Sequence, residues 1–189
     1  MTYEMDIAGL KRDLPLCQVT EDLYIGAFIM FGDVEVTVHA AAELLKRAPE
    51  YDYLIAPEAK AIPLLYEMAR QSGAEKYFVS RKRAKSYLSE VFEVNVKSIT
   101  TMHMQKLVLD MEDAKMIEGK RMLIIDDVIS TGESLHATEE LVRRAGGIIA
   151  GRMAVLAEGA AQKRDDIIYL APLPTFNPDG TVKEGSVLV

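Results

Sequence analysis

Cysteine is nearly absent from this 189-residue chain, and histidine is scarce. With Cys17 as its one cysteine, the chain can form no internal disulfide, which fits a reducing compartment. Cys17 itself is interpreted as a small apolar filler. The spacing of His39, His103 and His136 is not typical of a metal site, and no Ser-His-Asp or Cys-His arrangement is recognisable. The sequence therefore supports neither a histidine-ligated metal nor a catalytic triad.

Positive charge is also in short supply. The formal net charge is -7 and the pI is about 5.1, which argues against general nucleic-acid binding because that needs a basic surface. A local basic cluster can still bind an anionic substrate within an acidic protein. No apolar run is long enough to span a bilayer, and the N-terminus lacks a basic-then-apolar secretory pattern. We expect a cytoplasmic protein that binds neither nucleic acid nor membrane.

What the chain does have is an ordinary globular composition, with 49% hydrophobic and 27% charged residues. Its length fits one domain. Apolar runs predict strands at 53–56, 77–79, 122–125, 148–157 and 167–170. Amphipathic patterns predict helices at 36–47, 61–70 and 135–145. Strands that alternate with helices indicate an α/β fold with a doubly wound, mostly parallel sheet, whose ligands bind at the carboxyl ends of the strands.

Punctuating residues set the expected boundaries. Thr37 is expected to cap the first helix, Pro57 to stop the first core strand, and Gly73 to end the second helix. The segments 92–101 and 106–110 are extended and could pair as a hairpin. This hairpin would be an excursion from the α/β core and is a candidate for a mobile lid.

The most informative run is 121–134, in which four apolar residues precede Asp126 and Asp127. A short loop ending in Ser130-Thr131-Gly132 then feeds a helix, so free backbone N–H groups and the positive end of the helix dipole form a phosphate site. The expected phosphate-binding residues are Val128, Ile129, Ser130, Thr131, Gly132, Glu133 and Ser134. The two carboxylates would repel that phosphate, but they suit neighbouring ribose hydroxyls or a magnesium ion carried by the ligand. The run therefore predicts a sugar-phosphate site.

This run is similar to the phosphoribosyl pyrophosphate (PRPP) loop of type I phosphoribosyltransferases, in which apolar strand residues precede two acids and a Thr-Gly pair. The resemblance covers roughly residues 51–158. It implies a single phosphoribosyltransferase-like domain with a small N-terminal hood (1–35), an α/β core (36–170) with an inserted flexible loop, and a C-terminal tail (171–189). Glu133 stands where related adenine enzymes often carry glycine, and it is expected to face solvent.

A second segment, 56–61, follows a predicted strand and opens a helix. It resembles the P-E-A-R-G turn that binds pyrophosphate in adenine and xanthine phosphoribosyltransferases, which implies this role for Glu58, Ala59 and Lys60. Lys60 replaces the usual arginine and Ala61 the usual glycine. A lysine can neutralise a phosphate but lacks the bidentate fork of arginine. An ordinary helix start is the alternative interpretation.

The densest basic run, 80–87, has four cations within five residues, and their mutual repulsion would be relieved by an anion. Its R-K-x-x-K-S pattern resembles the purine phosphoribosyltransferase segment that reaches pyrophosphate, in some members across a dimer interface. The resemblance implies catalytic roles for Arg81 and Lys85 and a pyrophosphate contact for Lys82. A solvated charged face is the alternative.

Candidates for a base pocket are more scattered. Glu158, at a strand end, is placed like the acidic residue that borders the base in this family, and Phe28, within the apolar run 23–31, and Asn95 are further candidates. Lys97 and Ser98 resemble the S-x-T region of the family's flexible catalytic loop. The alternatives without a functional role are a surface charge at Glu158 and a regular strand at 94–101.

The resemblance implies a purine phosphoribosyltransferase that joins a free base (adenine first, xanthine or guanine second) to PRPP, giving a nucleoside monophosphate and pyrophosphate. Magnesium would come with PRPP, Asp126 and Asp127 would join Arg81 and Lys85 in catalysis, and a homodimer is expected. One alternative is a PRPP-binding regulatory protein without transferase activity, which the altered Lys60-Ala61 turn favours and the absence of a recognisable DNA-binding segment disfavours. The other is an orotate or pyrimidine phosphoribosyltransferase, because the loop does not identify the base.

Overall fold

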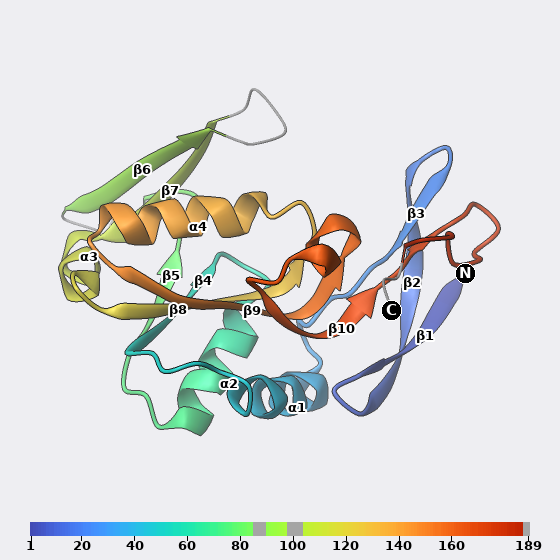
Figure 1. Ribbon diagram of the computed structural model, residues 1–189, viewed down its shortest axis with the longest axis horizontal. Coiled ribbons are helices and arrows are strands. Elements are labelled where there is room, and N and C mark those ends of the chain that lie inside the picture. The colour runs from blue at the N-terminus through green and yellow to red at the C-terminus, as the bar shows by residue number, and fades with distance from the viewer. Residues whose placement is uncertain (85–89, 98–103, 187–189) are drawn as a thin grey trace.

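The computed structural model describes residues 1–84, 90–97 and 104–186, and its centre is a five-stranded parallel sheet (Figure 1). The strand order is β10-β9-β8-β4-β5. Its strands are β4 (Tyr53–Pro57), β5 (Tyr77–Ser80), β8 (Arg121–Ile129), β9 (Ile148–Glu158) and β10 (Ile168–Leu173). Every neighbouring pair within this sheet is parallel. The predicted α/β class with a doubly wound, mostly parallel sheet is confirmed.

Helices cover both faces of this sheet. Helices α1 (Val34–Leu45) and α2 (Ile62–Ser72) lie on one face and α4 (Glu133–Arg144) on the other, with the short α3 (Met111–Ile117) near the end of the sheet (Figure 1). Alternate residues of β8 enter two separate hydrophobic clusters. Leu123 and Ile125 pack with α1 and α2, whereas Met122 and Ile124 pack with α4. Burial on both faces explains why β8 begins as a continuous apolar run.

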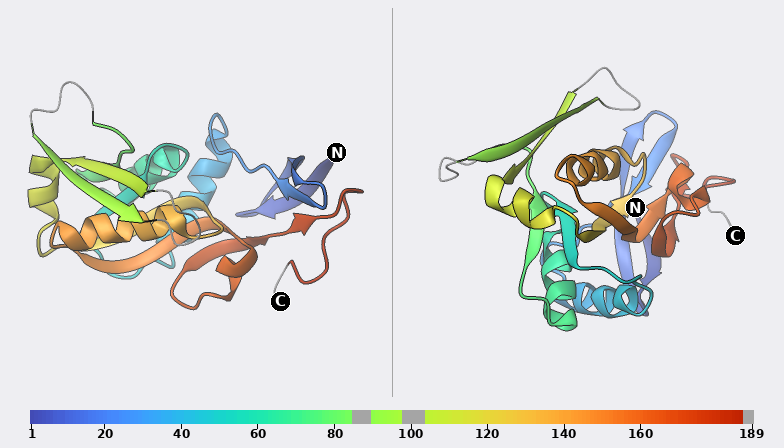
Figure 2. Two further views of the ribbon diagram at one scale, coloured as in Figure 1. Left: turned by 90° about the horizontal axis from the view of Figure 1, so that it is seen from above. Right: turned by 60° about the vertical axis from the view of Figure 1, so that its left-hand side comes forward.

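A second, antiparallel sheet forms the N-terminal hood. Its strand order is β1-β2-β3-β11, and its strands are β1 (Thr2–Ile7), β2 (Leu10–Thr20), β3 (Leu23–Gly26) and β11 (Thr175–Phe176). β11 comes from the opposite end of the chain and pairs with β3 through Thr175 opposite Ile25. Its Phe176 ring lies 4.9 Å from that of Tyr3. The segment 175–176 is thus part of the hood, and the N-terminus lies at this end of the molecule (Figures 1 and 2).

The start of α1 differs from the sequence prediction. Asp33 is the N-cap, and its carboxylate accepts a hydrogen bond of 3.1 Å from the Val36 N–H. Thr37 was the expected cap, but it lies in the first turn, where its hydroxyl donates to the Asp33 carbonyl at 2.7 Å. The prediction for Thr37 is therefore wrong, because an aspartate with stronger capping geometry precedes it. The predicted helix end at Gly73 is confirmed, with φ +73°.

The predicted hairpin is present as β6 (Val91–Lys97) and β7 (Met104–Asp110), which pair in antiparallel register from Val91 opposite Asp110 to Lys97 opposite Met104. It packs over α4 through Val94 and Leu107 (Figure 2). Ser98 lies outside the described residues. That this hairpin acts as a lid stays a prediction.

Candidate active site

The order of the strands creates a crevice between β4 and β8. From β4 the chain moves to β5 on one side of the sheet, and β8 then returns to the other side of β4. The connections that follow β4 and β8 therefore diverge, and ligands of open α/β sheets bind at such a switch point. Lys60 follows β4, and Asp126 and Asp127 lie near the carboxyl end of β8. The two best-matched sequence segments meet at this place.

The sequence pattern suggested that the acidic pair follows the strand, but in the structure the pair lies within β8. The strand continues to Ile129 because it stays paired with β9, with Ile129 opposite Ala157. Asp126 and Asp127 are only 8% and 2% exposed. The Asp127 N–H donates to Asp126 Oδ1 at 2.9 Å. Because successive strand residues face opposite ways, Asp126 lies on the α4 side and Asp127 on the side of α1 and α2.

Lys60 is the cation that balances these acids. Its Nζ lies 3.0 Å from Asp127 Oδ2. The contact is an ion pair and not a hydrogen bond, because Asp127 Oδ2 is buried and accepts no hydrogen bond from the described residues. Burial raises the pKa of Asp126 well above its ordinary value, the charge of Asp127 raises it further, and Lys60 opposes the shift. Burial also raises the pKa of Glu158 at the end of β9, again opposed by Lys60. One ammonium group therefore acts on three carboxyl groups.

The loop after β8 encloses a small cavity of about 50 Å³. Asp126, Leu135 and all seven residues predicted to bind phosphate line it: Val128, Ile129, Ser130, Thr131, Gly132, Glu133 and Ser134. Gly132 has φ +76°, a conformation that a residue with a Cβ rarely adopts. Glu133, which was expected to face solvent, is half-buried. The cavity has the size of a small anion rather than of a base.

The two helices that begin at the crevice differ from the others described. Asp33 caps α1 and Asp110 caps α3, whereas α2 and α4 have no side-chain cap. At α4 the first intrahelical bond is donated by His136 to the Gly132 carbonyl, so the preceding N–H groups lie at the mouth of the loop. Gly132 has no side chain that could cap α4, and the Glu133 N–H donates to Thr131 Oγ1 at 3.5 Å. The helix dipole still favours an anion at this end of α4. The α2 turn offers fewer donors, because Ile62 donates to Ala59 and Pro63 has no N–H.

Two buried hydroxyls beneath the crevice were missed by sequence reasoning. Ser80 Oγ on β5 lies 3.3 Å from Thr138 Oγ1 on α4, and the Thr138 hydroxyl donates to the Ser134 carbonyl at 2.9 Å. Both residues are fully buried. They join the first turn of α4 to the sheet. The available signal was a polar residue, Thr138, on the otherwise apolar face of this helix.

The basic run is only partly described, because Lys85 lies outside the described residues. Arg81 is half-buried, and its backbone is hydrogen-bonded to the hairpin. Its N–H donates to the Val108 carbonyl at 3.0 Å, and its carbonyl accepts from the Val108 N–H at 2.7 Å. The Lys82 N–H donates to Glu58 Oε2 at 3.4 Å, which links this run to the turn after β4. The Glu58–Ala59 peptide bond in that turn is cis. Both segments therefore border the same side of the crevice.

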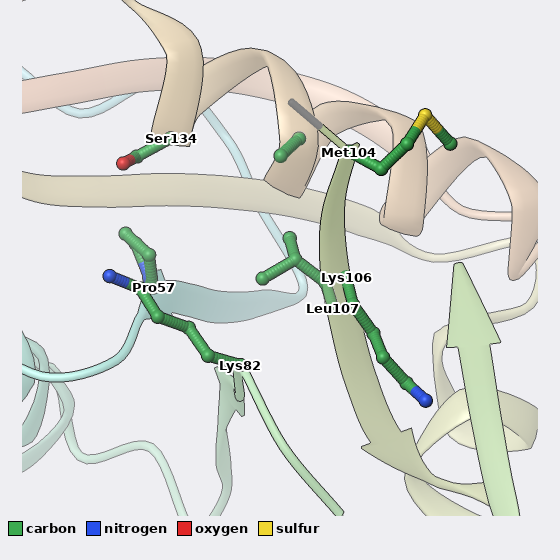
Figure 3. Close-up of a pocket in the computed structure, with 7 residues that line it drawn as sticks. Pro57, Lys82, Met104, Lys106, Leu107 and Ser134 are labelled. Atoms are coloured by element: carbon green, nitrogen blue, oxygen red, sulfur yellow. The ribbon is translucent and has the colours of Figure 1, made fainter. Parts of the chain in front are cut away.

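A larger cavity of about 330 Å³ lies beside this turn (Figure 3). It is lined by Pro57, Lys82, Met104, Lys106, Leu107, Ser134 and Ala137. The Lys82 side chain extends toward Pro57, whereas Lys106 points away and pairs with Glu93 at 2.5 Å (Figure 3). The hairpin thus closes one side of a space that begins at the phosphate loop.

The base-pocket candidates are dispersed. Phe28 is 7% exposed and packs in the hydrophobic cluster that includes α1 and α2. Asn95 lies on β6, where its amide donates to Glu93 Oε1 at 3.4 Å on an exposed face. Glu158 is the candidate that shares the crevice with Lys60. A base-binding role stays a prediction for each.

No group of three or more His, Cys, Asp or Glu side chains within residues 1–84, 90–97 and 104–186 could hold a metal ion. In the same described part of the chain, no helix is long and apolar enough to cross a membrane.

Together the fold and the crevice define an α/β protein with a small loop-lined cavity at the switch point of its sheet. Residues 35–175 match the family model of the phosphoribosyl transferase domain, and the chain belongs to this family. It is 33% identical over 126 residues to an adenine phosphoribosyltransferase of Kosmotoga olearia, a match that covers 64% of this chain and 66% of that protein, just under two thirds. It is 31% identical over 132 residues to an orotate phosphoribosyltransferase of Caldanaerobacter subterraneus, covering 69% of this chain and 58% of that protein.

Among solved structures, the adenine phosphoribosyltransferase of Thermoanaerobacter pseudethanolicus is similar with a TM-score of 0.63. The alignment covers 91% of this chain and 95% of that chain at 22% sequence identity. At this identity the likeness shows a shared fold.

Proposed function

We propose that this protein transfers the phosphoribosyl group of PRPP to a free purine base, with adenine as the first choice and xanthine or guanine as the second. The observation that carries the proposal is the meeting of the uncapped α4 loop with the buried Asp126–Asp127 pair and Lys60 at the switch point. The similarity to the adenine phosphoribosyltransferase of Kosmotoga olearia and the position of Glu158 support a purine substrate.

In the proposed complex, the 5′-phosphate occupies the cavity at 128–134, and the Asp126 and Asp127 carboxyl groups bind the ribose hydroxyls. Lys60 leaves Asp127 for the pyrophosphate, where Arg81, Lys82 and Lys85 add positive charge. As the glycosidic centre develops oxocarbenium character, negative charge grows on the departing pyrophosphate. Cations at that position stabilise the transition state more than the ground state, which is the condition for a faster chemical step.

Magnesium enters this proposal as part of the substrate. Carboxylates are oxygen ligands of the kind that magnesium accepts, and magnesium is usually bound through one or two of them together with substrate phosphates. Asp126 and Asp127 fit that pattern, and a resident metal site would need more ligands than the described residues gather.

The test is pyrophosphate release from magnesium-PRPP with adenine, guanine, xanthine, hypoxanthine and orotate, each run with the wild type and with Asp127→Asn as the impaired control. We expect release with a purine and loss of about 1.5–3 kcal/mol of transition-state stabilisation in the variant, the size of a charge-assisted hydrogen bond. Thermal shifts with the same bases and a PRPP analogue would rank the bases independently of turnover.

A second candidate is transfer to orotate, which the Caldanaerobacter relative favours. Release with orotate alone would select it. Tight PRPP binding without release for any base would instead select a PRPP-responsive regulatory protein, the alternative that the altered Lys60-Ala61 turn favours.

A further inference from the structure

Arg164 lies outside every segment that the sequence pattern marked as functional. It follows the 3-10 helix η1 (Gly159–Lys163), and Asp166 holds it in a bidentate pair. Arg164 Nε donates to Asp166 Oδ1 at 2.8 Å, and Nη2 donates to Oδ2 at 2.7 Å. The third nitrogen, Nη1, lies 3.1 Å from the position that a Cβ would occupy at Gly132. The guanidinium group is therefore packed against the phosphate loop.

This contact shows where a side chain at Gly132 would point. Its Cβ would lead toward the Arg164 guanidinium group. Arg164 fills the place that the missing side chain leaves, and it brings a fixed positive charge to the loop.

A cation at this position is electrostatically unusual. The N-terminus of α4 carries the positive end of the helix dipole, where cations are disfavoured and anions favoured. Arg143 and Arg144 in the last turn of α4 follow the usual rule, whereas Arg164 sits at the opposite end. An anion in the loop would convert this unfavourable arrangement into a favourable one.

Carboxylates keep Arg164 in place. Asp166 is the main cause of the raised pKa of Arg164, and Glu139 adds to it. Arg152 on β9 links these two acids, because it forms an ion pair with Glu139 and lies 3.5 Å from Asp166. The network connects β9, α4 and the segment before β10, so the guanidinium group is oriented before any ligand arrives.

We propose that Arg164, which lies beside the α4 loop and not among the residues that line its cavity, stabilises the 5′-phosphate through its charge. Asp166 holds the guanidinium group in this place, so that its charge adds to the helix dipole of α4 and favours a phosphate monoester dianion. This inference rests on the proposed function, since it assigns the loop to the 5′-phosphate. It predicts that Arg164 serves the phosphoester end of PRPP and not the pyrophosphate end, which lies on the Lys60 side of the crevice.

The experiment uses ribose 5-phosphate and inorganic pyrophosphate as separate probes, because neither depends on the identity of the base. Isothermal titration compares the wild type with Arg164→Gln and Arg164→Lys. Arg144→Gln is the matched control, since it removes an arginine that pairs with Glu140 at the other end of α4. Melting temperatures of all variants verify folding.

We expect Arg164→Gln to weaken ribose 5-phosphate binding about tenfold, because the guanidinium charge beside the loop attracts the phosphate dianion. Arg164→Lys should recover part of the loss, and pyrophosphate binding should not change. Arg144→Gln should bind both probes like the wild type. In turnover, Arg164→Gln should raise the KM for PRPP with little change in kcat, because the contact persists through the reaction.

Ribose 5-phosphate affinity within twofold of wild type in Arg164→Gln, or a parallel loss for pyrophosphate, would overturn the inference and leave the proposed function standing. A wild-type protein that binds neither ribose 5-phosphate nor PRPP would overturn the proposed function and this inference with it. If Arg164→Gln does not fold, Asp166→Asn tests the same point by releasing the guanidinium group. A selective, smaller loss of ribose 5-phosphate affinity supports the inference, and none overturns it.

Discussion

Asp126 combines two demands that oppose each other at the scale of a single residue. Its carboxyl group is buried beside a second carboxylate, which raises its pKa, yet the ribose contact that we propose uses the same buried oxygens. The native protein therefore retains a proton on Asp126 at pH values where the unfolded chain has lost it. By linkage, the free energy of unfolding falls as the pH rises from the ordinary aspartate pKa through the raised one.

We therefore expect Asp126→Asn to be more stable than the wild type at pH 7, although it is impaired in PRPP use. A gain of about 1 kcal/mol would appear as a rise of about 2–4 °C in Tm for a protein of this size. The difference should shrink toward pH 4, where the wild-type carboxyl group is protonated in the native state and only about half ionised in the unfolded chain. Calorimetry from pH 4 to pH 8 measures both trends, and an equal or lower Tm of the variant at pH 7 contradicts them.

At the scale of an element, the start of α4 depends on the backbone conformation of a single glycine. Gly132 is both the N-cap of α4 and the residue with φ +76°. A β-branched side chain disfavours this backbone by about 1–2 kcal/mol and would displace the Arg164 guanidinium group.

Gly132→Val is thus expected to remain folded and to lose binding of PRPP and of every nucleoside monophosphate alike, because in the proposed complex the loop contacts the phosphate and not the base. Gly119→Val provides the matched control, since Gly119 has φ +71° with nothing within 4 Å of its Cβ position. It should show a similar drop in Tm with normal ligand affinity. Titration of both variants with a monophosphate and with PRPP tests whether the loop binds phosphate. If Gly132→Val binds either ligand with an affinity within a few-fold of wild type, the loop has another role.

Elements that depend on local pattern were predictable from the sequence. The buried strands of the core are short apolar runs, and the α4 loop is contiguous, so its residues are recognisable together. The strands of the hood were missed because β2 is largely exposed and β11 is only two residues long. Arg164 and Thr138 were missed for a different reason: each acts through contacts with segments distant in sequence, Gly132 with Arg164 and Ser80 with Thr138. No local spacing encodes such contacts.

At the scale of the whole molecule, the expected homodimer stays a prediction, and it bears on where Arg81 acts. If Arg81 reaches the crevice of the partner subunit, a mixture of Arg81→Ala and Asp127→Asn chains will contain hybrid dimers with one intact site. Random exchange should then restore about a quarter of the wild-type activity. Light scattering establishes the oligomeric state, and kinetics after subunit exchange measure the recovery. A dimer that shows no recovery would place Arg81 and Asp127 of one subunit in the same site.

The pairing of β11 with β3 bears on the order in which the protein assembles. The parallel core is complete once Leu173 has been synthesised, but the hood lacks its edge strand until Phe176 can reach Tyr24 and Tyr3. Closing a contact across nearly the whole chain is entropically costly and slow compared with local pairing. The crevice between β4 and β8 can therefore form on the nascent chain before the hood that stands beside it. Pairing of the edge strand of the hood is thus expected to be a late step of folding.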